Sequence, residues 1–228
     1  MIVGITHLGY QWDFETARNV LPDLLSGVVA TVELTAIVMA LSLVVGLIVG
    51  FMRLSRFLPL RGFAYVFTEL FRTTPLLVQI IWFYFVLPVQ LHVTWPTFQL
   101  GVVALTCNVS SFLAEIFRGG ILSVDPGQRE AALSTGMSEW QAMAKIVFPQ
   151  AFTRSIPLLA AMWISLFKDT SLVSVIGIQE IMFHAKLQAL NTYRPVEIFT
   201  VTALIYFALT FPQSIAVNWL FHRFRTVE

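Results

Sequence analysis

The sequence is poor in charge. Charged residues make up 12% of the 228-residue chain and hydrophobic residues 57%, whereas a soluble domain carries about twice that share of charge. This composition cannot cover a water-exposed surface, so we expect an integral membrane protein. The net charge of +1 gives no indication of nucleic-acid binding or of a polybasic lipid anchor.

Cysteine is almost absent. The single cysteine, Cys107, lies within an apolar segment. One cysteine cannot form an internal disulfide, and its surroundings predict that it packs against apolar side chains. The N-terminus also lacks a basic region followed by a cleavage site, so no removable signal peptide is expected.

The common catalytic motifs are missing as well. The sequence has no G-x-x-x-x-G-K-[ST] phosphate loop, so the chain is not expected to hydrolyse ATP itself. Its four histidines are scattered, which leaves no cluster for a metal ion, and no serine, histidine and aspartate can be singled out as a triad. We predict a protein that is not an enzyme and holds neither metal nor cofactor.

Long apolar runs dominate the chain instead. A helix of about 20 apolar residues spans a bilayer, and five runs reach that length: 27–52, 63–87, 98–117, 155–183 and 196–221. Gly46 and Gly50 form a small-xxx-small pair that predicts close approach of another helix. The segment 185–195 is predicted to be a polar loop. The sequence thus predicts one all-α membrane domain, residues 1–228, with five transmembrane helices.

Basic residues are distributed unevenly between the runs. With the N-terminus outside, the inner segments hold nine Lys or Arg residues and the outer segments three. Cytoplasmic loops carry the excess of Lys and Arg, so we predict an outer N-terminus and a cytoplasmic C-terminus. This orientation puts the long polar interval between the third and fourth runs inside the cell.

That polar interval, 123–149, carries helix start signals. Asp125 can cap a helix that begins at Pro126, with Gln128 at the reciprocal capping-box position. Ala131 and Ala132 leave a low-relief patch beside Glu130, which suits close approach of another protein.

The end of the first helix and the start of a second are also marked. Gly136 is a natural left-handed stop. Ser138 caps a second helix with Gln141 three residues on, and Pro149 is expected to close that helix or bend the chain after it. From these signals alone, the pair could equally lie on the membrane surface as a structural element.

The residues of this helix pair resemble a known motif. Three residues separate Glu130-Ala131-Ala132 from Gly136, and nine separate Gly136 from Ile146-Val147-Phe148-Pro149. This resembles the EAA motif of ABC importer permeases, in which Leu is usual where Phe148 stands. The flanks AEIFRGGI at 114–121 and FKDTSLVS at 167–174 resemble the polar amino-acid uptake branch, and the resemblance extends from about Thr31 to Arg225.

The resemblance implies a type I ABC importer permease fold with cytoplasmic coupling helices at about 125–148. It implies a multi-pass subunit of the bacterial inner membrane that pairs with an identical or paralogous permease. Two ABC ATPase subunits would bind ATP and Mg²⁺, and a periplasmic or extracellular solute-binding protein would deliver the amino acid. Glu130, Ala131, Ala132 and Gly136 would then sit in a groove of the ATPase. A self-sufficient secondary transporter or channel is the alternative from the residues alone, and a scaffold subunit of a membrane enzyme is a third.

Charged residues within spans are costly and usually functional. Asp169 follows Lys168 in the fourth run, and Gly177 favours a broken helix near that depth. Asp169 is a candidate ligand for a substrate ammonium group, although it could instead pair with a residue of another span such as Arg72. Glu69 and Arg72, three residues apart, are predicted to pair with each other.

Polar residues on three runs could complete a substrate site. Met162 and Ser165 share a helix face with Asp169. Asn108 is a buried amide that needs partners, and Thr74 and Gln79 flank Pro75. Each of them could also serve only as a contact between helices. In the family resembled, the segments like 71–76 and 168–172 lie beside the translocation path, with Gly more usual where Thr73 stands.

The candidate site offers no second acid. A cationic side chain buried there would need one. We therefore expect an acidic or neutral polar substrate such as glutamate, aspartate or glutamine, rather than arginine, lysine or histidine.

Overall fold

The computed structural model describes residues 11–92 and 94–225, with side chains as far as Phe221. These residues form helices joined by short turns, and none of them forms a strand. The first half holds α1 (Phe14–Asn19), α2 (Leu21–Leu54), α3 (Leu58–Thr73), α4 (Leu76–Leu91) and α5 (Thr97–Leu122). The second half holds α6 (Pro126–Ser134), α7 (Glu139–Ala142), the π-helical turn η1 (Met143–Val147), α8 (Phe148–Asp169), the 3-10 helix η2 (Thr170–Ile176), α9 (Ile181–Thr192) and α10 (Pro195–Arg225).

Four helical segments are long and apolar enough to cross a membrane: Phe14–Leu54, Thr97–Leu122, Glu139–Ile176 and Pro195–Phe221. A fifth candidate consists of α3 and α4 together, bent by 108° at the break between them. These elements agree with the predicted all-α fold and with the predicted five spans, but the second run is a broken pair rather than one helix.

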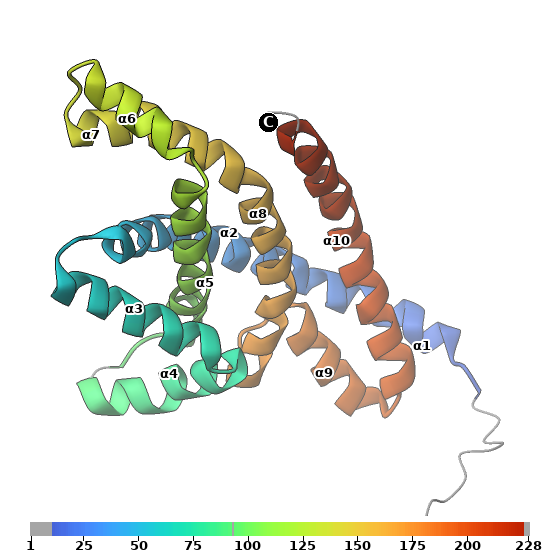
Figure 1. Cartoon of the computed structure of the whole chain (residues 1–228). Coiled ribbons are helices and arrows are strands. Elements are labelled where there is room, and N and C mark those ends of the chain that lie inside the picture. Colours follow the sequence, from blue (N-terminus) through green and yellow to red (C-terminus); the bar gives the residue numbers. More distant parts are fainter. Residues whose placement is uncertain (1–10, 93, 226–228) are drawn as a thin grey trace, which may run out of the picture.

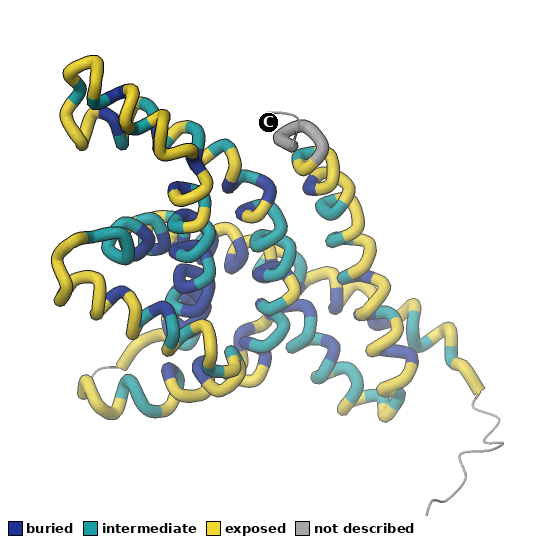
Figure 2. The backbone as a smooth tube through the Cα atoms, in the orientation of Figure 1, coloured by how far each residue is buried: buried dark blue, intermediate teal, exposed yellow. Residues whose placement is uncertain are grey.

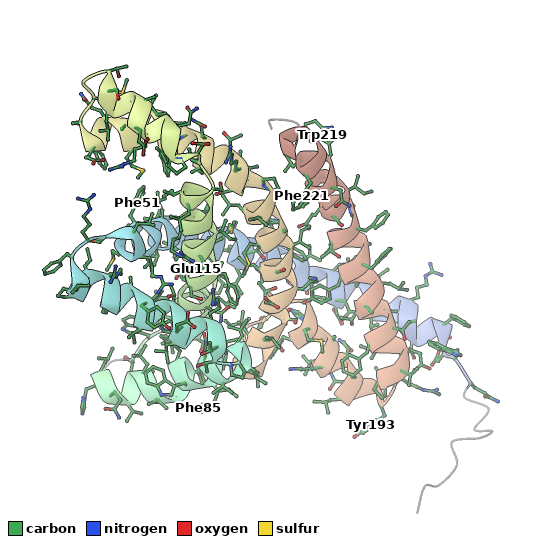
Figure 3. The ribbon with its side chains drawn as sticks, in the orientation of Figure 1. Phe51, Phe85, Glu115, Tyr193, Trp219 and Phe221 are labelled. Carbon is green, nitrogen blue, oxygen red and sulfur yellow. The ribbon has the colours of Figure 1, made fainter. Side chains whose placement is uncertain are left out.

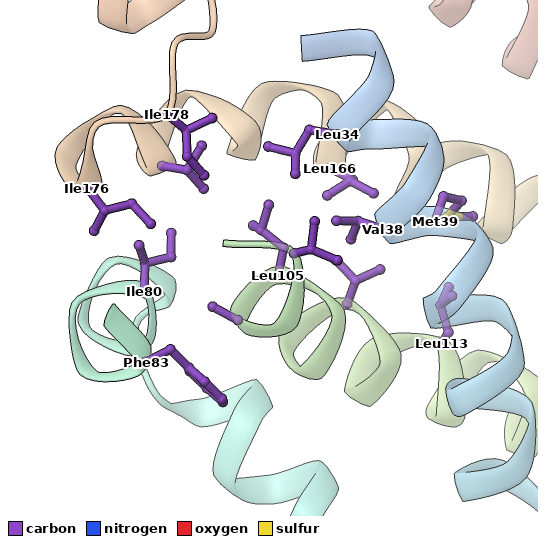
Figure 4. Packing of buried hydrophobic residues seen from close by; sticks show 14 of the residues in the cluster. Leu34, Val38, Met39, Ile80, Phe83, Leu105, Leu113, Leu166, Ile176 and Ile178 are labelled. Atoms are coloured by element: carbon purple, nitrogen blue, oxygen red, sulfur yellow. The ribbon is translucent and has the colours of Figure 1, made fainter. Parts of the chain in front are cut away.

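Helix α5 is the centre of the molecule and packs against α2, α3, α4 and α8. It is mostly buried, whereas α6 and α7 are mostly exposed (Figure 2). The main core joins Leu34 and Val38 of α2 to Leu105 of α5 and Leu166 of α8 (Figure 4). Within a bilayer, where lipid tails are as apolar as these side chains, close packing between the helices is what holds such spans together.

The glycine pair of α2 permits its close contact with α5. A Cβ at Gly46 would lie 2.6 Å from Leu113 Cβ, and one at Gly50 would lie 3.0 Å from the Ala114 carbonyl oxygen. Both contacts would be closer than normal carbon contacts. The predicted close approach is therefore confirmed, and α5 is the helix that uses it.

The segment 185–195, predicted to be a polar loop, instead contributes most of α9. The Glu180 carboxylate caps this helix by accepting from the Met182 and Phe183 amides at 2.9 and 2.7 Å. Ile181 and Ala185 are buried in a second core with residues of α2 and α10. Tertiary burial of one helix face therefore overrides the polar character of the sequence.

The helix that starts at α7 does not end at Pro149. It continues through the π-helical turn Met143–Val147 into α8, where Pro149 is the second residue. Proline has no N–H to donate to the carbonyl four residues back, and its ring crowds that carbonyl. A wider turn just before Pro149 accommodates both effects, so the expected stop is absent.

Candidate functional site

Helices α6 and α7 project from the bundle as an arm beyond the ends of α5 and α8 (Figure 1). The Asp125 side chain accepts from the Gly127 amide at 2.6 Å, and Ser138 and Gln141 form a reciprocal capping box. Gly136 ends the first helix with φ +87°. These predicted caps and this stop are confirmed, but Gln128 forms no capping box and accepts a bond from Gln150 at 3.5 Å.

An ion pair between Arg129 and Glu139 joins the two helices of the arm. Glu130 and Ala131 are exposed, whereas Ala132 is buried with 6% of its surface exposed. The patch predicted from both alanines is therefore formed by Ala131 alone, because Ala132 faces inward. Trp140 of α7 is 74% exposed and lines a groove of about 620 Å³ beside the arm.

The first break in the bundle separates α3 from α4. Thr74 and Pro75 are both extended, with ψ of 135° and 131°, as expected for a proline and the residue before it. A cavity of about 320 Å³ lies at this break. Its lining is apolar apart from Thr74 and Gln79.

Two amide side chains close this break. Gln79 Nε2 donates to the carbonyls of Phe71 and Thr74, each at 2.8 Å. Asn108 Nδ2, from α5, donates to the Phe71 carbonyl at 2.9 Å and to Gln79 Oε1 at 3.3 Å. The last carbonyls of a helix lack partners within it, and these two amides supply them. Thr74, Gln79 and Asn108 are thus brought together as the sequence suggested.

The second break separates α8 from α9. Helix α8 ends at Asp169, a 3-10 helix follows, and Gly177 turns the chain with φ +88°. The Thr170 and Ser174 hydroxyls donate to carbonyls three residues back, each at 2.7 Å. The predicted broken helix is confirmed, and its own hydroxyl groups satisfy its backbone.

Met162, Ser165 and Asp169 all lie on α8 and are partly buried. The structure does not pair Asp169 with Arg72, because Arg72 lies 3.5 Å from Glu69, the predicted partner. Within the described ranges, the Asp169 carboxylate has no hydrogen bond and no ion pair within 4 Å. No hydrogen bond links this α8 group to the Thr74, Gln79 and Asn108 group in the same ranges.

Sequence reasoning missed two polar contacts. The sequence suggested that Gln79 and Asn108 could share a polar site, but it did not show that they bond to each other and to the carbonyls at the end of α3. Glu115 contacts Arg118, three residues on, at 2.8 Å and Arg53 of α2 at 3.0 Å. The helical spacing could have revealed the first partner of Glu115 but not the second. Among the residues described, no three His, Cys, Asp or Glu side chains gather as metal ligands would.

The chain matches a known protein family over most of its length. A family model described as "Binding-protein-dependent transport system inner membrane component" matches residues 42–226. The chain belongs to this family of transport permeases. The permease is 33% identical over 221 residues to the glutamate/aspartate import permease protein GltK of Escherichia coli O6:H1, covering 94% of this chain and 99% of the relative.

Two further comparisons agree. The permease is 32% identical to the arginine transport system permease protein ArtQ of Bacillus subtilis, covering 86% of this chain and 90% of that one. A crystal structure of an amino acid ABC transporter with histidines matches with a TM-score of 0.87 at 35% identity, over 94% of this chain and all of that one. The chain is therefore the permease subunit of an amino-acid ABC importer, with a type I fold, and a transport component rather than an enzyme.

Proposed function

We propose that this permease carries an acidic or neutral polar amino acid, such as glutamate, aspartate or glutamine, and that Asp169 holds the substrate's ammonium group. The observation that carries this proposal is the Asp169 carboxylate at the second break, which makes no hydrogen bond or ion pair within the described ranges and has only the charge of the adjacent Lys168 near it. A charged group in a partly buried position needs a counter-ion. A substrate ammonium would supply it.

The substrate carboxylate needs donors from the same lining. The Thr74 hydroxyl makes no hydrogen bond within the described ranges, and Thr74 is one of the residues that line the cavity at the first break. The Gly177 N–H donates to the Ser174 carbonyl at 3.2 Å, so a backbone donor at this break would have to come from a neighbouring N–H that the turn leaves unbonded. Asn108 would have to release the Phe71 carbonyl before it could contribute, whereas Gln79, Met162 and Ser165 would line the remaining walls.

Three acids near the spans are already paired, which supports a substrate without a cationic side chain, although Glu33 of α2 is exposed and makes no hydrogen bond or ion pair within the described ranges. Glu69 is paired with Arg72, and Glu115 with two arginines. Glu180 accepts from two backbone amides and from the Tyr206 hydroxyl at 2.8 Å. None of these carboxylates is left to bind a second ammonium or a guanidinium. The similarity to an arginine permease favours the rival, a cationic substrate.

Competition for uptake separates the two substrate classes. The full importer, with its solute-binding protein, is reconstituted in vesicles, and uptake of labelled glutamine or glutamate is measured. Unlabelled glutamate, aspartate or glutamine should inhibit strongly. Inhibition by arginine or lysine without any by these three would overturn the substrate class and leave the permease assignment intact.

The coupling proposal concerns the arm. Two ATPase subunits, which bind ATP and Mg²⁺, would each hold one arm of a permease pair, with Glu130, Ala131 and Gly136 at the contact. Ala132, buried in the arm, would support that surface from within. ATP-driven closure would switch the pair between inward- and outward-open states. In the predicted orientation, the single domain 1–228 lies in the bacterial inner membrane with its arm in the cytoplasm.

Reversing the charge at Glu130 tests this contact. Glu130 is exposed and its side chain has no partner in the described part of the chain, so Glu130→Lys should leave the membrane fold intact. We expect weaker co-purification of the ATPase and a loss of substrate-stimulated ATP hydrolysis. Wild-type co-purification of the ATPase together with wild-type substrate-stimulated hydrolysis would show that the ATPase binds a surface other than the one around Glu130.

A further inference from the structure

A cavity of about 430 Å³ lies where the end of α2, the start of α3 and the last turns of α5 meet. We call it the arginine pocket. It is lined by Arg53, Leu58, Arg61, Gly62, Tyr65 and Arg118. It is separate from both breaks and from the surface of the arm.

The charges around the arginine pocket do not balance. Three guanidinium groups line it, and Glu115, labelled on α5 in Figure 3, contacts two of them, those of Arg53 and Arg118. Arg61 forms no ion pair and no side-chain hydrogen bond within the described ranges. Arg53 Nε and Glu115 Oε1 are both buried without a hydrogen bond there, so the one carboxylate does not satisfy even its nearest guanidinium fully. The pocket therefore holds three positive charges against one negative charge, and Arg61 lacks an anionic acceptor.

The guanidinium of Arg53 is held in place. It lies 4.7 Å from the centre of the Tyr65 ring, a cation–π arrangement that fixes its plane. Its Nη2 atom contacts Glu115 at 3.0 Å. A fixed, planar guanidinium is suited to bidentate contact with a phosphate group.

The rim of the pocket is apolar and exposed on one side. Leu58, which lines the pocket, exposes 65% of its surface, and its chain neighbour Phe57 exposes 66%. The pocket lies at the end of α2 and one turn before the end of α5, where candidate spans terminate. Cations beside exposed apolar side chains at the end of a span match a lipid, which has an anionic headgroup and apolar chains.

We propose that the arginine pocket binds the phosphate of an anionic phospholipid headgroup. The guanidinium groups of Arg53, Arg61 and Arg118 contact the phosphate oxygens, and the acyl chains cover Leu58 and Phe57. Basic pockets between transmembrane helices are known to hold anionic headgroups. An acidic protein segment would satisfy the charges but would leave the apolar rim in water, so the lipid fits better.

Native mass spectrometry of the purified importer complex tests the proposal. The complex is titrated with phosphatidylglycerol or with zwitterionic phosphatidylcholine, and bound lipid is counted. Arg61→Gln is the test variant, since Arg61 has no partner whose loss would disturb the fold. Arg56→Gln is the matched control: Arg56 is exposed at the same end of the molecule and lies outside the pocket.

We expect Arg61→Gln to reduce phosphatidylglycerol affinity about fivefold, the factor that corresponds to about 1 kcal/mol for one basic residue at an anionic surface. Arg56→Gln and phosphatidylcholine binding should change little. Equal losses in both variants would mean general surface attraction and would overturn the site. So would displacement of the lipid by millimolar glycerol phosphate, which would identify a free-phosphate site.

Two other outcomes would also overturn it. If Arg61→Gln weakens ATPase association in lipid-free detergent, the pocket receives an acidic protein surface. If the complex retains no phosphatidylglycerol above the level of phosphatidylcholine, the pocket is covered within the assembly.

Discussion

The backbone groups at the two breaks in the membrane bundle find their hydrogen-bond partners in different ways. At the first, the ends of α3 and α4 are closed by Gln79 and by Asn108 of a neighbouring span. At the second, Thr170 and Ser174 satisfy the backbone locally, and the Asp169 carboxylate is left without a hydrogen bond or ion pair within the described ranges. The amide donors of the first break are used within the protein, whereas the second break keeps a carboxylate without a hydrogen bond or ion pair.

This difference indicates separate roles. At the first break, the amide donors already bond to the protein. They can hold the bend between α3 and α4, but few donors remain there for a ligand. A break that satisfies its own backbone and carries a free acid can offer that acid to a cation. Discontinuous helices in transporters use such points for binding. We infer that the second break supplies the charge for recognition, whereas the first mainly fixes the bend and offers the Thr74 hydroxyl as its remaining donor.

The largest effect should come from removing the charge at the second break. Asp169→Asn keeps the size of the side chain but cannot balance a substrate ammonium. We expect transport to fall to background while the complex still assembles and docks its ATPase. Uptake in vesicles and gel filtration measure the two properties. Normal transport in this variant would remove Asp169 from the site and end the contrast between the breaks.

A smaller effect should follow at the first break. Asn108→Leu removes a donor from the Phe71 carbonyl and from Gln79 Oε1, which should cost about 1 to 2 kcal/mol of stability. Thermal unfolding of the purified permease in detergent measures it. Ser165→Ala is the matched control, because that hydroxyl makes no hydrogen bond in the described part of the chain. A control as unstable as Asn108→Leu would show that the contrast is wrong.

The sequence predicted the second break better than the first. One local pattern predicts both the break and its charge, because Asp169, the adjacent hydroxyl residues and Gly177 lie close together in the chain. The closure of the first break depends on Asn108, which comes from another helix. Pro75 indicates that a helix stops there, but the 108° bend follows from packing on α5, which no local signal contains.

The same distinction explains the other corrections. The caps at Asp125 and Ser138 are local, and both were predicted. Helix α9 depends on how the chain packs, and the sequence predicts a loop there. The π-helical turn is a local response to Pro149, but the proline alone does not distinguish it from a stop or a bend. For Glu115, helical spacing predicts Arg118 as a partner but cannot predict Arg53, which lies on another helix. Contacts with distant partners are therefore the ones that the sequence does not contain.

An effect no larger than that of Asn108→Leu should come from the turn at Gly177. This residue has φ +88°, and no atom lies within 4 Å of a Cβ added there. Gly177→Ala therefore meets no neighbour, and its cost is the backbone strain alone, about 1 to 2 kcal/mol.

The matched control is Gly119→Ala: Gly119 lies in α5 with equally open space and no positive φ. Alanine is favoured over glycine within a helix by about 0.5 to 1 kcal/mol, so the control should be neutral or slightly stabilising. Thermal unfolding in detergent compares the two, and uptake shows whether the strain also reaches Asp169, eight residues earlier in the chain. Equal stability changes for both substitutions would mean that the second break tolerates other conformations at Gly177, and that its geometry does not depend on a left-handed turn.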